Sequence, residues 1–140
     1  MYGLGVLIKG LSNNSDSFNA IQSSIGCTIR KVFLDEDNNN LVFWLSNDSE
    51  LKIWDGGQSC CESRFMTTDD NLNEYFGSVL LGMELKPVVR NSEDEEDNWG
   101  DVHEIQFLDI NTSKGTFQMA NHNCHNGYYG GFYIEASINF

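Results

Sequence analysis

Residues 28–54 read TIRKVFLDEDNNNLVFWLSNDSELKIW, in which three apolar runs are separated by two polar segments. The runs are rich in β-branched and aromatic residues and have the length of β-strands. The polar segments DEDNNN and SNDS contain Asn and Asp, which tolerate left-handed backbone conformations and bond to their own backbone in turns. The sequence therefore predicts a three-stranded antiparallel meander over residues 28–54.

Two short helices are predicted on either side of this meander. Residues 13–25 place Ile21 and its apolar neighbours at helical spacing after polar residues that can cap the helix. The second helix is expected to be capped by Thr68 or Asp69 and to stop at Gly77. Both helices have one apolar face, which is expected to pack on the sheet.

Four further strands are predicted in the second half of the chain. The first covers residues 79–89, where Pro87 indicates an edge strand or a break. Residues 101–110 and 114–120 are expected to form a hairpin, and residues 130–140 a final strand. The predicted class is α+β, with a curved antiparallel β-sheet and two short helices.

Composition limits the possible functions. The chain has 140 residues, and 8 Lys and Arg against 21 Asp and Glu give a net charge of −13. Such a chain has few cations for neutralising phosphates, so extended nucleic acid is not an expected partner. The hydrophobic fraction of 40% is too high for a disordered acidic tail. A single folded domain over residues 1–140 is expected.

The same composition guides expectations about the compartment and the cysteines. No apolar run has the roughly 20 residues needed to span a bilayer, so we expect no membrane association and a cytoplasmic location. Four cysteines are too few for a disulfide scaffold in a chain of this length, which favours reduced thiols. Cys27 and Trp44 lie in apolar strand contexts and are expected in the core.

Residues 91–101, NSEDEEDNWGD, are expected to form an acidic loop inserted in the domain. A solvated loop is the simplest interpretation of this run of like charges. The alternative is that Glu93 to Asp97 mimic a phosphate backbone and bind a basic protein.

The segment NHNCHNGYY, residues 121–129, is the most unusual part of the chain. Its density of donors, acceptors and flat rings is poor core material, since each buried polar group would need its own partner. A hydrogen-bonded loop that organises only itself is one interpretation. A ligand site is another, in which Tyr128 and Tyr129 stack on a base while His and Asn side chains bind its edges. Arg64 could hold a phosphate of the same ligand.

Metal binding and catalysis are two further alternatives for this segment. His103, His122, Cys124, His125 and the Cys60–Cys61 pair are residue types that bind zinc, but no C-x-x-C pair is present. On a strand His122 and His125 would point to opposite faces, whereas on a turn they could converge. In a thiol hydrolase, Cys60 or Cys61 would be the nucleophile beside a histidine, with Glu62 or Glu104 orienting the base.

Three motifs also point to a family. They are WDGGQSCCESRFMTTDD (residues 54–70), GDVHEIQFL (100–108) and NHNCHNGYYGGF (121–132). Together they resemble a family of small uncharacterised proteins of phages and bacteria, a domain of unknown function with a D-G-Q-S-C-C-E-like motif and a C-terminal H-N-x-H-N-G-Y-Y-G-G motif. The chain departs from this pattern at Cys124, where Glu is common, and by one extra glycine at Gly56 or Gly57.

The resemblance implies a role connected with phages. Phages carry small acidic proteins that blunt host defence, either as sponges for cyclic-nucleotide signals or as decoys bound to defence nucleases. The hypothesis is therefore an anti-defence protein that sequesters a small cyclic nucleotide without cleaving it. The nuclease inhibitor and a Cys/His metal-dependent or thiol hydrolase are the alternatives. We expect binding rather than catalysis, no cofactor, and a homo-oligomer.

The expected ligand-binding residues are drawn from the three motifs. They are Cys60, Cys61, Glu62, Arg64, Asp69, His103, His122, Asn123, His125, Asn126, Tyr128 and Tyr129. No catalytic or metal-binding residue is assigned.

Overall fold

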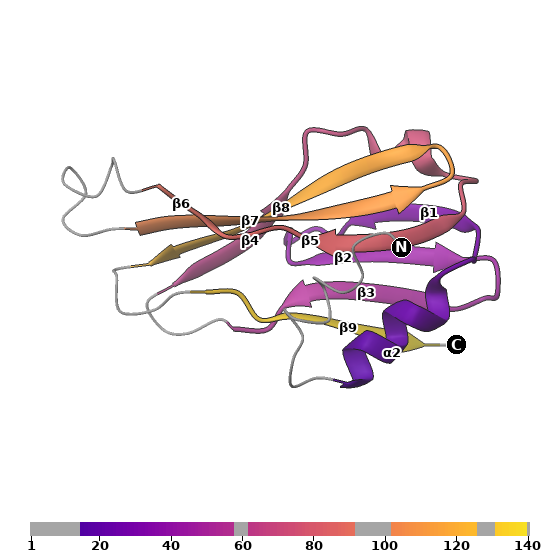
Figure 1. Ribbon diagram of the computed structural model, residues 1–140, viewed down its shortest axis with the longest axis horizontal. Helices are drawn as coiled ribbons and strands as arrows, with labels where there is room; N and C mark the ends of the chain where they lie inside the picture. Colours follow the sequence, from indigo (N-terminus) through magenta and orange to yellow (C-terminus); the bar gives the residue numbers. More distant parts are fainter. Residues whose placement is uncertain (1–14, 58–61, 92–101, 126–130, 140) are drawn as a thin grey trace.

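The computed structural model describes residues 15–57, 62–91, 102–125 and 131–139 (Figure 1). Within these ranges the chain forms one α-helix, one 3-10 helix and nine strands. In chain order the elements are α2 (Ser15–Ser24), β1 (Ile29–Leu34), β2 (Asn40–Leu45), β3 (Glu50–Asp55), β4 (Ser63–Thr67), η1 (Leu72–Tyr75), β5 (Leu80–Leu85), β6 (Val89–Asn91), β7 (Val102–Thr112), β8 (Gly115–His125) and β9 (Ile134–Asn139).

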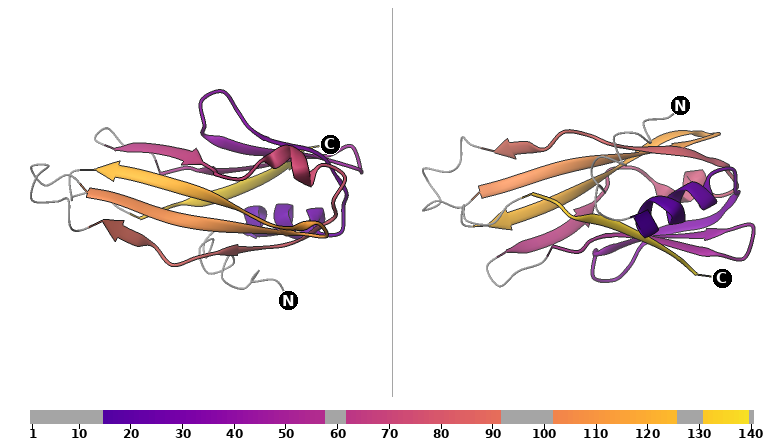
Figure 2. Two further views of the ribbon diagram at one scale, coloured as in Figure 1. Left: turned by 90° about the horizontal axis from the view of Figure 1, so that it is seen from above. Right: turned by 60° about the horizontal axis from the view of Figure 1, so that its bottom comes forward.

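The strands of the described residues form two antiparallel sheets that share one core. The first sheet has the order β1-β2-β3-β9, and the second has the order β4-β8-β7-β5, with β6 pairing to β7. Figures 1 and 2 show α2 beside β9, where Ser17 Oγ accepts a hydrogen bond from the Ala136 amide at 2.9 Å. The expected α+β class is confirmed. The strands divide between two sheets because β4, after leaving β3, pairs with β8.

The predicted meander is confirmed as β1, β2 and β3. Phe43 of β2 pairs with Val32 on one side and with Leu51 on the other. Asn38 and Asp48, in the two connecting turns, have positive φ angles of 57° and 65°. These are the left-handed conformations that Asn and Asp tolerate better than other side chains.

The two predicted helices form, but the second is short. α2 lies within the predicted range and buries Ile21 completely. The second is the single turn η1, whose cap is Asn71 rather than Thr68 or Asp69. Thr68 Oγ1 accepts from the Asp70 amide at 3.1 Å and donates to the Gln118 carbonyl on β8 at 2.7 Å, but it lies too far ahead of Leu72 to cap the turn. None of the helices in the described ranges is both long and apolar enough to pass through a membrane.

The strands of the second sheet differ from the sequence prediction in three ways. The strand predicted over residues 79–89 divides into β5 and β6, and Pro87 lies in the interruption between them. β8 continues to His125, five residues beyond the predicted end at residue 120. β4 was not predicted, because its inward-facing residues are Arg64 and Met66 rather than two apolar side chains.

The core lies between the sheets, where Phe43 of β2 meets Phe117 of β8 with ring centroids 6.4 Å apart. Both side chains are fully buried. The prediction that Trp44 is a core residue is wrong, since 44% of it is exposed. Successive strand residues face opposite ways, so Trp44 points outward when Phe43 points inward. Cys27 packs partly buried against the core.

Backbone hydrogen bonds join the two sheets at one end. Thr28 forms an isolated bridge with Val79, and the Ile29 amide donates to the Ser78 carbonyl at 2.7 Å. The Leu80 amide in turn donates to the Cys27 carbonyl at 2.9 Å. The opposite end, where β8 finishes and β9 begins, is the end that carries the polar residues described next (Figure 1).

Candidate functional site

The face of β8 that points to the core changes from apolar to polar along the strand. Phe117 and Met119 are fully buried on this face. Further along, Asn121, Asn123 and His125 occupy the same face and are also buried. Because buried polar side chains are costly unless they are hydrogen-bonded, this end of the sheet is the candidate site.

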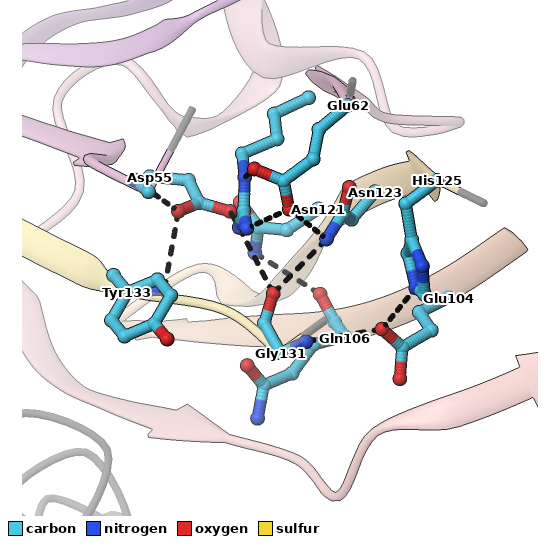
Figure 3. Close-up of polar contacts among 11 residues, drawn as sticks. Asp55, Glu62, Glu104, Gln106, Asn121, Asn123, His125, Gly131 and Tyr133 are labelled. Atoms are coloured by element: carbon cyan, nitrogen blue, oxygen red, sulfur yellow. Dashed lines mark hydrogen bonds and ion pairs between the residues drawn. The ribbon is translucent and has the colours of Figure 1, made fainter. Parts of the chain in front are cut away.

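The polar residues that gather here are called the polar cluster (Figure 3). It consists of Asp55, Glu62, Arg64, Glu104, Asn121, Asn123, His125 and the backbone of Gly131. Strand register explains the convergence, since Arg64 on β4 and Glu104 on β7 are the partners of Asn123 on its two sides.

Arg64 is the charged centre of the polar cluster, and only 4% of its side chain is exposed. Nη1 donates to Asp55 Oδ2 at 2.8 Å and to the Gly131 carbonyl at 2.9 Å, while Nη2 donates to Glu62 Oε2 at 2.5 Å. Burial lowers the pKa of the guanidinium, but the hydrogen bonds and charges of the two carboxylates outweigh it, so the pKa is raised. To bind a phosphate with two hydrogen bonds, Arg64 would have to release a carboxylate.

The other half of the polar cluster holds Gly131 through both of its backbone polar groups. Asn123 Nδ2 donates to the Gly131 carbonyl at 3.3 Å and to Glu62 Oε2 at 3.1 Å. Glu104 Oε1 accepts from the Gly131 amide at 3.0 Å and contacts His125 Nε2 at 2.8 Å. These contacts fix the backbone that leads into β9.

Two buried oxygens in the polar cluster accept no hydrogen bond from any described residue. They are Asn121 Oδ1 and Asn123 Oδ1, the buried side-chain atoms without a partner in the described part of the chain. The amide nitrogens of both residues donate to oxygens, Asn121 Nδ2 to the Gln106 carbonyl at 3.0 Å. This fixes which end of each carboxamide is the acceptor. An unpaired buried acceptor costs about 1–3 kcal/mol.

Gly57 and Tyr133 border the polar cluster. Both of their amides donate to Asp55 Oδ1, each at 3.1 Å. A Cβ added at Gly57 would lie 2.9 Å from Arg64 Cζ, which explains why glycine fits this position. Tyr133 is 59% exposed, and its ring centroid lies 5.6 Å from Arg64 Cζ.

His103 and His122 lie on the opposite face of the second sheet, away from His125. The strand geometry predicts this separation, because His122 and His125 are three residues apart on β8. His122 Nδ1 is 2.9 Å from His103 Nε2, and the His122 ring stacks on Phe65 with centroids 4.6 Å apart. Burial, together with the charge of His103, lowers the pKa of His122.

The structure therefore divides the predicted site residues into three groups. Glu62, Arg64, Asn123 and His125 belong to the polar cluster, while His103 and His122 form a pair on the outer face. Asp69 is exposed and lines a separate outer cavity. Cys60, Cys61, Asn126, Tyr128 and Tyr129 lie outside the described residues, as do residues 92–101 of the acidic segment.

Asp55 and Asn121 belong to the polar cluster but were not among the predicted binding residues, and Glu104 was predicted only to orient a catalytic base. Asp55 follows an apolar strand and precedes two glycines, so its sequence context is typical of a turn. Asn121 had a detectable signal, because a strand that alternates from Phe117 and Met119 places it on the buried face. Within the described ranges, no cluster of His, Cys, Asp and Glu side chains could hold a metal ion.

The fold and the site define a mostly β, single-core protein with a buried polar cluster at one end of its second sheet. The chain belongs to the family described as domain of unknown function DUF7448, whose model matches residues 22–134. Comparison with curated proteins finds no match, and comparison with solved structures finds none either.

Proposed function

We propose that the protein binds a small nucleotide at the polar cluster and sequesters it without cleaving it. The observation that carries this proposal is the pair of buried oxygens, Asn121 Oδ1 and Asn123 Oδ1, that accept no hydrogen bond within the described chain. A nucleobase with an exocyclic amino group supplies the donors that such oxygens bind. The exposed ring of Tyr133 offers a stacking surface beside the same cluster.

The charge of the polar cluster favours contacts with the base over contacts with phosphate. One guanidinium, that of Arg64, contacts the carboxylates of Asp55 and Glu62, and Glu104 adds a third carboxylate. The described members therefore carry a net formal charge of −2 before any charge on His125 is counted. A negative site repels phosphate groups, so we expect the phosphates of a bound nucleotide to point away from the cluster.

The resemblance to phage-encoded proteins supports a biological role for this binding. A protein that holds a cyclic nucleotide signal lowers its free concentration in proportion to the amount of protein present. This role needs affinity but no turnover. Cyclic dinucleotides are the first ligands to test, because each molecule presents two bases.

Isothermal titration calorimetry against cyclic dinucleotides, cyclic mononucleotides and nucleosides tests the proposal. We expect binding by ligands whose base carries an amino group, with the nucleoside retaining part of the affinity. Asn123→Leu should weaken binding about tenfold or more, because it removes one acceptor and one donor. Asn73→Ala, an exposed amide change on η1, is the matched control and should bind like the wild type.

Two outcomes would overturn the proposal. One is the absence of heat for every ligand at near-millimolar concentration while circular dichroism shows a folded protein. The other is the appearance of cleaved nucleotide when the mixtures are analysed by chromatography. Sedimentation of the same samples tests the expected homo-oligomer.

A further inference from the structure

The outer face of the second sheet carries a line of hydrogen-bonded side chains that the polar cluster does not use. Thr67 on β4, His122 on β8 and His103 on β7 all point to this face. Thr67 Oγ1 lies 2.7 Å from His122 Nε2, and His122 Nδ1 lies 2.9 Å from His103 Nε2. The three groups thus form a continuous chain from a hydroxyl to an imidazole to a second imidazole.

The orientation of His122 in this chain is fixed. Its ring lies nearly parallel to that of Phe65, with an interplanar angle of 6° and centroids 4.6 Å apart. With one ring face covered and both nitrogens hydrogen-bonded, the imidazole has one orientation. A hydroxyl paired with a base whose second nitrogen is held by a third group is the arrangement that activates nucleophiles in enzymes.

A cavity adjoins Thr67, at the hydroxyl end of this series of hydrogen-bonded side chains. Its volume is about 160 Å³, and its lining consists of Thr67, Thr68, Asp69, Asp70, Phe107, Gln118 and Ala120. Thr67 is exposed, so its hydroxyl is accessible from this cavity. His103, at the other end of the hydrogen-bonded series, does not line the cavity.

We propose that Thr67 is the nucleophile of an ester-cleaving site, with His122 as its general base and His103 as the residue that positions His122. The Thr67 oxygen attacks the carbonyl carbon of a small carboxylic ester and passes its proton to His122 Nε2. The bond to the alcohol breaks, and the alcohol leaves with that proton, so the acyl group remains on Thr67. Water then attacks the acyl-threonine and releases the carboxylic acid.

The protonation state of His122 agrees with this role. Burial and His103 lower the pKa of His122, so the ring is neutral near pH 7 and can accept a proton. In the required tautomer Nδ1 carries the hydrogen and donates to His103 Nε2. This hydrogen bond leaves Nε2 without a hydrogen and directed at the Thr67 hydroxyl.

The cavity also indicates which esters fit. Asp70 Oδ2 accepts a hydrogen bond from the Gln118 amide at 2.8 Å, and Asp69 lies beside it on the cavity lining. Two carboxylates next to the nucleophile disfavour anionic substrates. We therefore expect neutral and cationic esters to react faster than anionic ones.

Acylation by p-nitrophenyl acetate, quenched in acid and mapped by mass spectrometry, tests the proposal. Trypsin releases residues 65–90 as a peptide that contains Thr67 and no cysteine, so acyl-threonine is distinguished from acyl-cysteine. We expect the acetyl group on Thr67, its loss in Thr67→Ala and its retention in Thr67→Ser. His122→Gln should slow acylation at least tenfold. Thr116→Ala removes another exposed hydroxyl from the same face and should leave acylation unchanged.

Two further measurements separate positioning and charge effects from a structural role. His103→Gln should shift the pH profile of acylation to higher pH, because the charge of His103 lowers the pKa of His122. The mono-p-nitrophenyl ester of succinic acid should react more slowly than the acetate, and Asp69→Asn should reduce that difference. Acetylation confined to cysteines, or acetylation of Thr67 at the same rate in His122→Gln, would overturn the proposal.

Discussion

Arg64 is a predicted phosphate-binding residue whose guanidinium is already occupied in the structure. Its type suggests phosphate binding, yet its nitrogens are shared between Asp55, Glu62 and the Gly131 carbonyl. These partners are contributed by β3, by the residue before β4 and by the segment before β9. The guanidinium therefore ties three parts of the chain together at the polar end.

Replacing Arg64 should be costly for stability. Arg64→Ala leaves two nearly buried carboxylates without their cation, and we expect a loss of about 3–5 kcal/mol in the free energy of unfolding. Arg30→Ala is the matched control, because the Arg30–Asp48 pair is exposed and is worth roughly 0–1 kcal/mol. Urea denaturation followed by circular dichroism measures both, and equal losses would contradict the assignment.

For individual residues, the sequence identifies some members of the polar cluster but not the residues that they contact. Arg64, Glu62, Asn123 and His125 were predictable because their residue types are rare in a core and lie near one another in two motifs. Asp55 was not predictable, because its contact with the Tyr133 amide joins residues 78 positions apart. Register between distant strands determines such contacts, and a single sequence does not show it.

Among the elements, β8 contributes functional side chains to both faces of the second sheet. Its core-facing side chains enter the polar cluster, whereas His122 on its outer face links to His103 on β7 and to Thr67 on β4. One long strand thus supports two chemically distinct regions. Any shift of its register by one residue would exchange them.

The lowered pKa of His122 predicts how stability depends on pH. Between its lowered value and the ordinary imidazole value of 6.5, the unfolded chain binds a proton that the folded protein does not. The free energy of unfolding should therefore fall as pH decreases below about 6.5. His122→Gln should show a shallower decrease, measured by denaturant titration at several pH values. Identical slopes for the two proteins would refute the linkage to His122.

Local pattern explains which elements could be predicted. The meander β1–β2–β3 depends on turns within a short stretch, so Asn, Asp and strand-forming runs were sufficient. β4 was not predicted because Arg64 occupies an inward position that a core strand normally fills with an apolar residue. The second half of β8 was not included in the predicted strand for the same reason, since Asn121 and Asn123 face the interior.

On the scale of the whole molecule, the two sheets depend on each other through one core. Phe43 and Phe117 are fully buried and contact across it, and the core cluster includes residues of both sheets and of α2. Neither sheet can bury its apolar face without the other. We therefore expect the protein to unfold as one cooperative unit.

Phe117→Ala tests this cooperativity. Loss of the buried ring should cost about 3–5 kcal/mol. Phe117 lies in the second sheet, whereas Trp44 and Trp54 lie in the first. With Trp99, the third tryptophan, replaced by Phe, the fluorescence transition should shift to lower urea by the same amount as circular dichroism. Separate midpoints for the two probes would mean that the sheets unfold independently.

The two ends of the molecule differ in how the sheets contact each other. At one end backbone hydrogen bonds such as Ile29 to Ser78 join them. At the polar end the Met66 amide donates to the Asn38 carbonyl at 2.7 Å, and side chains such as Arg64 add further contacts. Side-chain contacts can be exchanged for contacts with another molecule, whereas backbone pairing between strands is rarely given up without unfolding. A molecule that enters the polar end can therefore replace side-chain contacts while backbone hydrogen bonds at both ends keep the two sheets together.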